Sequence, residues 1–260
     1  MKFKKNNLLS LDKFIEDSLY NKKLGYYMKS NPFGGKGDFV TAPNVSILFS
    51  EMIAIWVISF WENLNCPKQF NLIELGAGNG EMMSIMTNTF QRFPQFKNSC
   101  NIKILEKSKL LKKIQRKNIK YKEIKWLNNL DELNDLPCIF IANEFFDALP
   151  FKQFIKKNKE WHERYVKFNN QMKSEYVDIP FDIKKLEKKI KFKISSTQNF
   201  IEYSHLTSKY LKVITSKIKI NNGGILIIDY AYIDKKMKNT IQAVSKHRYT
   251  DVLTNFRNSD

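Results

Sequence analysis

Short apolar runs alternate along this chain with longer amphipathic stretches, and the alternation predicts strands and helices in turn. Apolar runs typical of buried strands occupy residues 71–75, 101–105, 138–142 and 225–230, with a weaker one at 121–124. Patterns with helical period occupy residues 1–20, 45–64, 81–86, 106–117 and 199–220. Strands that alternate with helices in this way predict an α/β fold with a doubly wound, mostly parallel sheet.

Two stretches interrupt this alternation. Residues 25–43 are rich in glycine, proline and aromatic side chains, which predicts a long functional loop. From Phe151 onward, alternating residues broken by asparagine pairs predict antiparallel hairpins. We therefore expect four segments, namely N-terminal helices with an aromatic loop (1–70), a ligand-binding core (71–150), a hairpin-rich insertion (151–198) and the remainder of the core (199–260).

Three glycines at alternate positions follow the first predicted core strand. Glu74 lies near the end of that strand, and Gly76, Gly78 and Gly80 then occupy alternate positions. Glycines allow the backbone a positive φ and allow a ligand to approach it closely. In open α/β sheets, nucleotide-like ligands bind at this end of a strand. The alternative is a glycine-rich turn that binds no ligand.

The spacing of the glycines bears on the choice of ligand. A dinucleotide fingerprint would place its third glycine at position 81, where this chain has Glu81. Glu74 adds negative charge beside the turn, which suits a cationic amine better than a pyrophosphate. S-adenosyl-L-methionine carries such an amine, an adenosine and no phosphate. We therefore interpret the turn as the methyl-donor site of a class I methyltransferase with a Rossmann-like core.

A second acid has the position expected for such a site. Glu106 ends the next predicted strand, 26 positions after Gly80. In nucleotide-binding folds, an acidic residue at the end of the second strand accepts hydrogen bonds from the ribose hydroxyls. Glu106 is therefore a candidate ribose ligand, and the alternative is a solvated charge at the start of a highly charged helix.

The fourth predicted strand ends in polar and aromatic residues, Asn143–Pro150. This ending resembles in position the Asn/Asp-Pro-Pro-aromatic signature of N-methylating enzymes, without its prolines, so Asn143 is a candidate for both the acceptor and the cofactor sites. A guanidinium acceptor stays protonated near neutral pH, so a carboxylate must hold it and take its proton. Glu144 and Asp147 are the candidates for that role.

Each of these acids has a structural alternative. Asp147 could cap a helix that follows the strand, and Glu144 could be a solvated turn residue. The loop at 25–43 adds a further acidic candidate, Asp38. Its alternative is a turn in which the Asp38 side chain bonds its own backbone.

The chain is strongly basic, with 44 Lys and Arg against 26 Asp and Glu and a formal net charge of +18 over 260 residues. Such a charge is compatible with a nucleic-acid surface. Arginine, however, reads phosphate better than lysine, and only five of the basic residues are arginine. We therefore expect solvated lysine-rich faces and no nucleic-acid partner.

Other sequence features narrow the class of protein. Cys66, Cys100 and Cys138 are scattered and form no CxxC pair, so we expect reduced thiols and no metal site. The sequence has no apolar run of 18 residues that would span a membrane. The first 19 residues lack the apolar centre of a signal peptide. We expect a cytoplasmic protein, or one of the mitochondrial matrix if the source is eukaryotic; a homodimer stays open.

Several of these segments together resemble the MidA-type, S-adenosyl-L-methionine-dependent methyltransferases found in bacteria and mitochondria. The segments that carry the resemblance are LGYY (24–27), GDFVTAPNVSILFSE (37–51), IELGAGNG (73–80), LEKS (105–108), Trp126, ANEFFDALP (142–150), the W-x-E-R motif that begins at Trp161, IDY (228–230) and QAVSKHRYTDVL (242–253). The resemblance implies a cofactor-binding role for Trp126. It also implies methylation of a protein arginine, on a respiratory complex I (NADH dehydrogenase) subunit.

The sequence departs from the family pattern in three ways. The family usually has Glu where this chain has Asn44, and Gly where it has Ser50. The family also continues with a further motif and helices where this sequence reaches Asp260, so the sequence is either a fragment or that of a naturally short protein. If the missing part shapes the acceptor pocket, we expect cofactor binding to survive while activity is lost. Two alternatives to a protein arginine methyltransferase stay open. One is an assembly chaperone that binds the cofactor with little catalysis, and the other is a small-molecule methyltransferase.

Overall fold

The structure is a computed structural model that describes residues 8–34, 38, 42–121, 123–169, 173–245, 247–254 and 256–259. The chain folds into two compact units. The first, here called the parallel-sheet unit, comprises residues 27–148 and 209–230. The second, the antiparallel-sheet unit, comprises the described residues of 8–26, 149–208 and 231–259.

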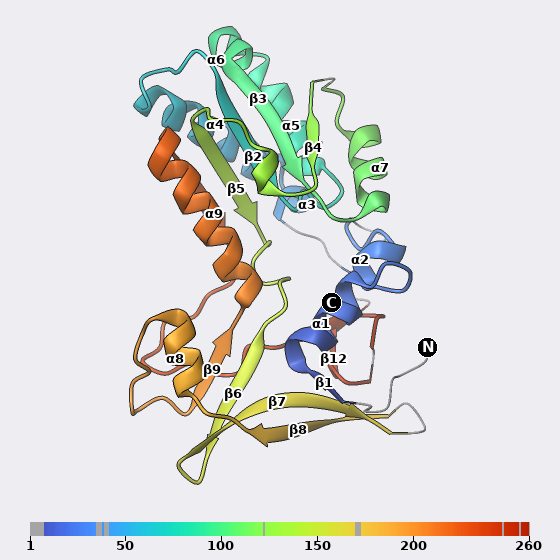
Figure 1. Ribbon diagram of the computed structural model, residues 1–260. Coiled ribbons are helices and arrows are strands. Elements are labelled where there is room, and N and C mark those ends of the chain that lie inside the picture. Colours follow the sequence, from blue (N-terminus) through green and yellow to red (C-terminus); the bar gives the residue numbers. More distant parts are fainter. Residues whose placement is uncertain are drawn as a thin grey trace. The chain divides into compact units, whose positions relative to one another are not determined.

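Among its described residues, the parallel-sheet unit contains five parallel strands in the order β10-β5-β2-β3-β4 (Figure 1). The strands are β2 (Phe70–Leu75), β3 (Cys100–Leu105), β4 (Lys125–Leu127), β5 (Cys138–Asn143) and β10 (Gly223–Ile228). The chain proceeds outward from β2 through β3 to β4 and then returns to the other side of β2 with β5. The order of the strands therefore reverses between β2 and β5, which is where ligands bind in open α/β sheets.

Helices cover both faces of this sheet because successive strand residues point to opposite faces and both sets are apolar. Leu72, Ile102 and Ile139 pack on one face with residues of α4 (Ile47–Asn63) and α5 (Glu81–Phe90). Residues that alternate with them, such as Ile73 and Leu105, pack on the other face with Ile214 of α9. The remaining helical segments of the unit are α3 (Ala42–Val45), α6 (Pro94–Ser99), α7 (Lys109–Asn118) and the 3-10 turn η1 (Leu130–Glu132).

The antiparallel-sheet unit is built around a long strand, β7 (Glu160–Phe168). It pairs on one side with β8 (Ser174–Pro180) and on the other with β6 (Lys152–Lys157) and β1 (Leu8–Ser10), and β9 (Phe200–Tyr203) adds to β6. Phe154, Leu186 and Ile201 form its buried centre. The hairpins predicted from Phe151 onward are therefore confirmed. This unit also contains α1 (Leu11–Tyr20), α8 (Lys184–Ile190) and the short hairpin of β11 (Ala243–Ser245) and β12 (Arg248–Thr250). Two helices, α2 (Tyr26–Lys29) and α9 (His205–Asn221), contain positions at which the chain passes from one unit to the other.

Several predicted boundaries were wrong because distant residues compete for the same backbone groups. Residues 8–10 were predicted as helix, but they pair with β7 as strand β1, and the helix begins at Leu11. The helix predicted over 199–220 begins at His205, because Phe200–Tyr203 pairs with β6. The weak strand expected at 121–124 lies at Lys125–Leu127 instead, where it pairs with β3. The helix predicted at 81–86 extends to Phe90, and the strand predicted at 225–230 occupies Gly223–Ile228.

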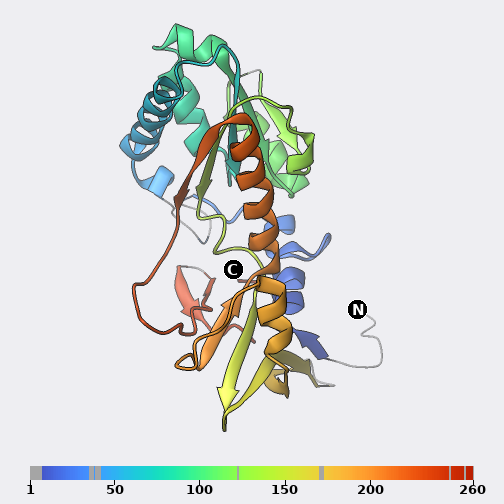
Figure 2. The ribbon, with the colours of Figure 1, turned by 60° about the vertical axis from the view of Figure 1, so that its left-hand side comes forward.

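The expected segment boundaries also differ from the observed grouping. Residues 8–26 belong with the antiparallel sheet and not with a separate N-terminal segment. Of the segment 199–260, residues 209–230 complete the parallel-sheet unit, and the described residues from 231 onward group with the other sheet. Figure 2 shows β10 as the edge strand beside β5, from which the chain leaves as a long coil.

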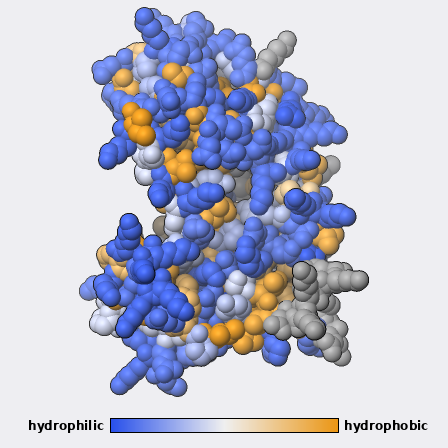
Figure 3. Space-filling view, in the orientation of Figure 1, coloured by the Kyte–Doolittle hydropathy of each residue, from blue (hydrophilic) through white to orange (hydrophobic). Residues whose placement is uncertain are grey.

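Most of the described lysines are exposed or half-buried, whereas Lys103 is buried. The face seen in Figure 3 is mostly hydrophilic, with small and separated hydrophobic patches. Within the described residues, no helix combines the length and the apolar composition that crossing a membrane requires.

Candidate functional site

The glycine turn follows β2 directly and leads into α5. Gly76 and Gly78 have φ values of +67° and +52°, a conformation that L side chains rarely adopt. A Cβ atom at Gly76 would lie 2.8 Å from Phe145 Cδ2, and one at Gly78 would lie 3.4 Å from Phe33 Cδ2. The turn therefore needs glycine at both positions for its backbone conformation, and at Gly76 also for the close approach of the Phe145 ring.

Glu74 lies below the turn in the centre of the sheet, between Ile104 of β3 and Ile141 of β5. Its side chain is 3% exposed, and among the described residues its Oε2 atom has no hydrogen-bond partner. Burial, together with the nearby Glu106 carboxylate, raises the pKa of Glu74 to about 8. A buried acid without a partner at Oε2 can take up a cationic group, and an amine fits this requirement.

Glu106 follows β3 and is held by donors from its own segment and from α7. Its Oε1 accepts a hydrogen bond from the Ser108 backbone N–H at 2.8 Å, and its Oε2 accepts one from Gln115 Nε2 at 3.0 Å. Burial raises the pKa of Glu106, and these hydrogen bonds oppose the rise because they favour the ionised form. A backbone hydrogen bond from Lys107 also acts on this carboxylate. Because two carboxylate oxygens offer about four lone-pair sites, Glu106 keeps room for a further hydrogen bond from a diol.

Trp126 of β4 is connected to the turn through Gln115. The Trp126 indole donates from Nε1 to Gln115 Oε1 at 2.8 Å, and Gln115 Nε2 also donates to the Gly78 carbonyl at 2.9 Å. The Arg116 guanidinium lies 4.8 Å from the centre of the Trp126 ring. The structure thus brings Trp126, Glu106 and the glycine turn together around one side chain.

Gln115 was not among the residues singled out from the sequence. A signal was present, because Leu111, Gln115 and Ile119 follow one another at intervals of four and all three are buried. A glutamine on the apolar side of an otherwise lysine-rich helix needs polar partners.

The acceptor candidates lie beside the turn at the end of β5. Ala142 is paired with Leu75, the last residue of β2, so Asn143 comes level with the start of the glycine turn. The Asn143 Oδ1 atom is buried and has no hydrogen-bond partner among the described residues. Glu144 is half-buried and has a φ of +47°, which is uncommon for a residue other than glycine and typical of functional turns.

Asp229, which follows β10, holds the turn that contains these acids. Its Oδ2 accepts hydrogen bonds from the backbone N–H groups of Phe146 at 3.1 Å and of Asp147 at 3.3 Å. The Glu144 N–H donates to the carbonyl of Ile228 at 2.9 Å. No role was predicted for Asp229 from the sequence, where it belongs only to the IDY segment of the family resemblance. Its hydrogen-bond partners, Phe146 and Asp147, are more than 80 positions away.

The helix-cap alternative for Asp147 is wrong. Between β5 and β6 the described backbone forms turns and no helix, and Asp147 Oδ1 accepts a hydrogen bond from the N–H of Ala148 at 2.7 Å. Asp147 is exposed. It therefore lies at the solvent side of the turn that Asp229 holds.

An aromatic group adjoins the glycine turn on the side of α9. Phe145, which lies against Gly76, makes an edge-to-face contact with Tyr210 of α9, with ring centres 5.4 Å apart. Burial and the Glu106 carboxylate raise the pKa of the Tyr210 hydroxyl. Tyr210, Phe33 and Phe145 are thus apolar neighbours of the turn that the glycine motif alone did not reveal.

The remaining candidate, Asp38, is half-buried. Residues 35–37 and 39–41 lie outside the described residues, so most of the GDFVTAP segment has no described structure. The role expected for Asp38 stays a prediction.

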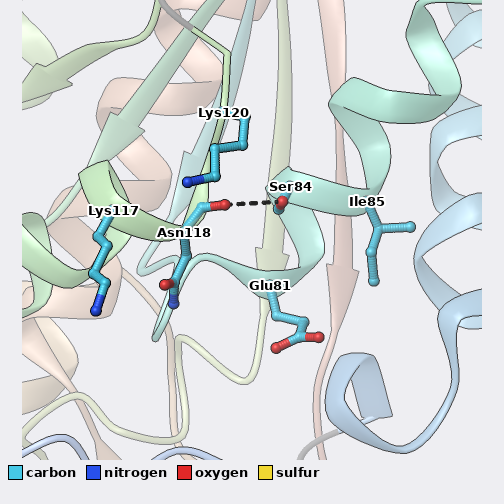
Figure 4. Close-up of a pocket in the computed structure, with 6 residues that line it drawn as sticks. All are labelled: Glu81, Ser84, Ile85, Lys117, Asn118 and Lys120. Atoms are coloured by element: carbon cyan, nitrogen blue, oxygen red, sulfur yellow. Dashed lines mark hydrogen bonds between the residues drawn. The ribbon is translucent and has the colours of Figure 1, made fainter.

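A shallow hollow lies on the outer side of the turn, between α5 and the end of α7. It is lined by Glu81, Ser84, Ile85, Lys117, Asn118 and Lys120 (Figure 4). Ser84 Oγ donates to the Asn118 carbonyl at 3.2 Å, and Asn118 Nδ2 donates to the Asn79 carbonyl at 3.0 Å. None of the predicted site residues lines this hollow. Among the residues that the structure describes, no group of His, Cys, Asp and Glu side chains could hold a metal ion.

Comparisons with known proteins bear on the family and the fold of the chain. Residues 52–260 match the model of a family described as S-adenosyl-L-methionine-dependent methyltransferases. A curated relative, protein arginine methyltransferase NDUFAF7, mitochondrial, of Xenopus laevis, is 26% identical over 277 residues. The alignment covers 97% of this chain and 63% of the relative, so the chain spans less than two thirds of that protein. A NDUFAF7 homolog of Drosophila melanogaster is 24% identical over 266 residues, which cover 92% of this chain and 60% of that protein.

A crystal structure of similar fold is that of a COG1565 superfamily member from Burkholderia thailandensis bound to S-adenosyl-homocysteine. It matches with a TM-score of 0.80 and 19% identity, over 97% of this chain and 68% of that one. At this identity the similarity shows the fold, and it confirms the predicted Rossmann-like α/β architecture.

Proposed function

Because the chain belongs to the S-adenosyl-L-methionine-dependent methyltransferase family that its residues 52–260 match, we propose that it transfers a methyl group from S-adenosyl-L-methionine to an arginine side chain of a protein. One observation carries the donor half of this proposal. A buried carboxylate with an unpartnered Oε2 atom, Glu74, lies under a glycine turn at the point where the strand order of the sheet reverses.

The chain's own residues would divide the work of holding the donor. Glu74 would bind the α-amino group, because a cation compensates the buried carboxylate. Gly76, Gly78 and Gly80 leave the backbone open to close approach. Glu106 would accept hydrogen bonds from the ribose hydroxyls, and the resemblance to the MidA-type enzymes implies that Trp126 would contribute to the same site. When bound, the donor supplies an electrophilic methyl group on a sulfonium.

The acceptor end would be formed by Asn143, Glu144 and Asp147. A guanidinium carries its charge over three nitrogens, and a carboxylate localises that charge by pairing with two of them. As the acceptor nitrogen takes the methyl group, Glu144 would take the proton that this nitrogen loses, so that charge balances. Phe145 and Phe146 would exclude water from the reacting atoms. The left-handed backbone at Glu144 and the hydrogen bonds that backbone N–H groups of the turn donate to Asp229 support a fixed geometry for this turn.

The protein substrate is proposed from the relatives and from the resemblance to the MidA-type enzymes. The curated relatives are called protein arginine methyltransferases. The resemblance adds a subunit of NADH dehydrogenase as the protein that carries the arginine. The whole set of activity, substrate and partner is a proposal, since this chain covers 63% of the first of these relatives.

The test is Glu144→Gln, which keeps the shape of the side chain and removes its charge. We expect donor affinity within about twofold of the unchanged protein and a loss of product by a factor of at least about 100, as for loss of a general base. Transfer of a tritiated methyl group into proteins of a cell lysate gives the product, and calorimetry gives donor affinity. Glu160→Gln, at an exposed position of β7, is the matched control. Undiminished labelling by Glu144→Gln would refute the assignment of Glu144.

A further inference from the structure

The residue that joins the parts of the donor site is Gln115. It lies on α7, a helix that otherwise presents lysine and arginine to solvent, yet its side chain is 0% exposed. A buried amide in an apolar setting is unfavourable unless its donors and acceptor are bonded. The partners that satisfy Gln115 therefore show what holds it in place.

Those partners come from separate segments of the proposed donor site. The amide nitrogen donates to the Gly78 carbonyl at 2.9 Å and to Glu106 Oε2 at 3.0 Å. The amide oxygen accepts from Trp126 Nε1 at 2.8 Å. The orientation of the amide follows from chemistry, because Gly78 and Glu106 offer only acceptors there and the indole N–H offers only a donor. A flipped amide would lose all of these bonds.

The backbone of α7 also packs against the turn. A Cβ atom placed at Gly80 would lie 3.2 Å from the Cα atom of Gln115 and 3.1 Å from the Ile119 side chain. The position of Gln115 relative to the turn is therefore constrained by its main chain as well as by its amide. A change of the side chain alone can remove the hydrogen bonds while this packing remains.

We propose that Gln115 is a positioning residue for the nucleoside end of the donor, which fixes the Glu106 carboxylate and the Gly78 carbonyl in the arrangement that binds the ribose. This inference rests on the proposed function. Ser108 donates to one oxygen and Gln115 to the other, and Lys107 also bonds this carboxylate, so Glu106 is kept in a single orientation. Of the roughly four lone-pair sites of a carboxylate, one is left for a ribose hydroxyl. Gln115 itself need not touch the donor.

The same bond affects the charge of Glu106. Removal of the Gln115 donor takes away an interaction that favours the ionised carboxylate, so the pKa of Glu106 rises further. Other groups that act on this carboxylate are Glu74 of β2, Lys112 of α7 and Tyr210 of α9. They are unchanged in a Gln115 variant, so a shift in the pH dependence of binding reports on the lost hydrogen bond.

The experiment compares Gln115→Met, which has similar length and no hydrogen bonds, with Gln153→Met as a matched control. Gln153 is also 0% exposed and also joins distant groups, donating to Glu202 and Asn239 and accepting from Arg164, but it lies in the antiparallel-sheet unit. Both variants lose a buried glutamine of similar bonding. Thermal unfolding of each protein measures the structural cost.

The probes are S-adenosylhomocysteine and 5′-methylthioadenosine, titrated by calorimetry between pH 5 and pH 8. The second probe lacks the amine, so the ionisation of Glu74 does not enter its binding through an amine contact. We expect Gln115→Met to bind both probes about tenfold more weakly, as for loss of a hydrogen bond to a charged group. We also expect its affinity to fall at a higher pH than that of the unchanged protein when the solution is acidified. Gln153→Met should match the unchanged protein in both respects.

The outcomes separate the inference from the function on which it rests. An unchanged protein that binds neither probe overturns both. An unchanged protein that binds both, together with a Gln115→Met variant of equal affinity and equal pH dependence, overturns the positioning role alone. Equal losses of affinity in Gln115→Met and Gln153→Met would also overturn it, because they would show a general effect of destabilisation.

Discussion

Binding of the donor should release a proton from Glu74. In the free protein, burial and the neighbouring Glu106 raise the pKa of Glu74 to about 8, so its carboxyl group is mostly protonated near neutral pH. If the amine of the donor pairs with the carboxylate, as proposed, the proton must leave when the donor binds. The number of protons released then depends on how many the free protein holds.

The expected size follows from that pKa. With a pKa of about 8 for Glu74, the free carboxyl holds about 0.9 proton at pH 7, about 0.5 at pH 8 and about 0.1 at pH 9. Titration of S-adenosylhomocysteine in buffers of different ionisation enthalpy measures these fractions, because the apparent binding enthalpy changes in proportion to the protons exchanged.

Two variants assign the proton. Glu74→Gln keeps the size of the side chain and should abolish the release, with weaker binding. Glu106→Gln should weaken binding but leave most of the release, because Glu74 still titrates. Binding of S-adenosylhomocysteine at pH 7 without proton release would refute the pairing of the amine with Glu74, and so would equal release from Glu74→Gln.

The same carboxyl should affect the stability of the free protein. The pKa of Glu74 in the folded protein lies above the ordinary value of 4.5. Between pH 4.5 and about 8, the folded state therefore holds a proton that the unfolded state has already lost. The Glu74 contribution to stability is therefore fully present below pH 4.5 and declines as pH rises through that window, by about 1.4 kcal/mol per pH unit. Urea unfolding of Glu74→Gln should lack this decline. A parallel pH dependence in both proteins would contradict the burial argument.

Two further predictions address other parts of the parallel-sheet unit. Gly78→Val should weaken donor binding by a factor of at least about 100 in calorimetry while thermal unfolding stays cooperative, because a β-branched residue is strained at a φ of +52° and its side chain occupies the space left for the donor. Unchanged affinity would reject the turn as the site. The Lys103 ammonium donates hydrogen bonds to Asn71 and Asn134. Burial lowers the pKa of Lys103, so the folded state holds fewer protons than the unfolded state just below pH 10.5. The unfolding free energy should therefore rise with pH in that range, and Lys103→Met should remove this rise in urea titrations; an identical rise in the variant would show that another group causes it.

The central sheet could be predicted because its chemistry is local. Strands buried on both faces require continuous apolar runs, and the runs at 71–75, 101–105 and 138–142 were each within one residue of the observed strands. The glycine turn was visible for a similar reason, since its backbone conformation demands glycine at particular positions.

The parts that escaped prediction depend on residues far apart in the sequence. Strand β1 exists because it pairs with β7, more than 150 positions later, while its own sequence also suits a helix. Gln115 and Asp229 act on the proposed site through partners up to 83 positions away. A single polar side chain carries no periodic signal, so its role appears only once its neighbours in space are known.

The most direct test of the account is the structure of this chain crystallised with S-adenosylhomocysteine. The account predicts electron density for the ligand at the turn of Gly76, Gly78 and Gly80, with its amine at Glu74 and its ribose at Glu106. Ligand density at any other place on the protein would contradict it, and so would a ligand at the turn whose amine lies away from Glu74.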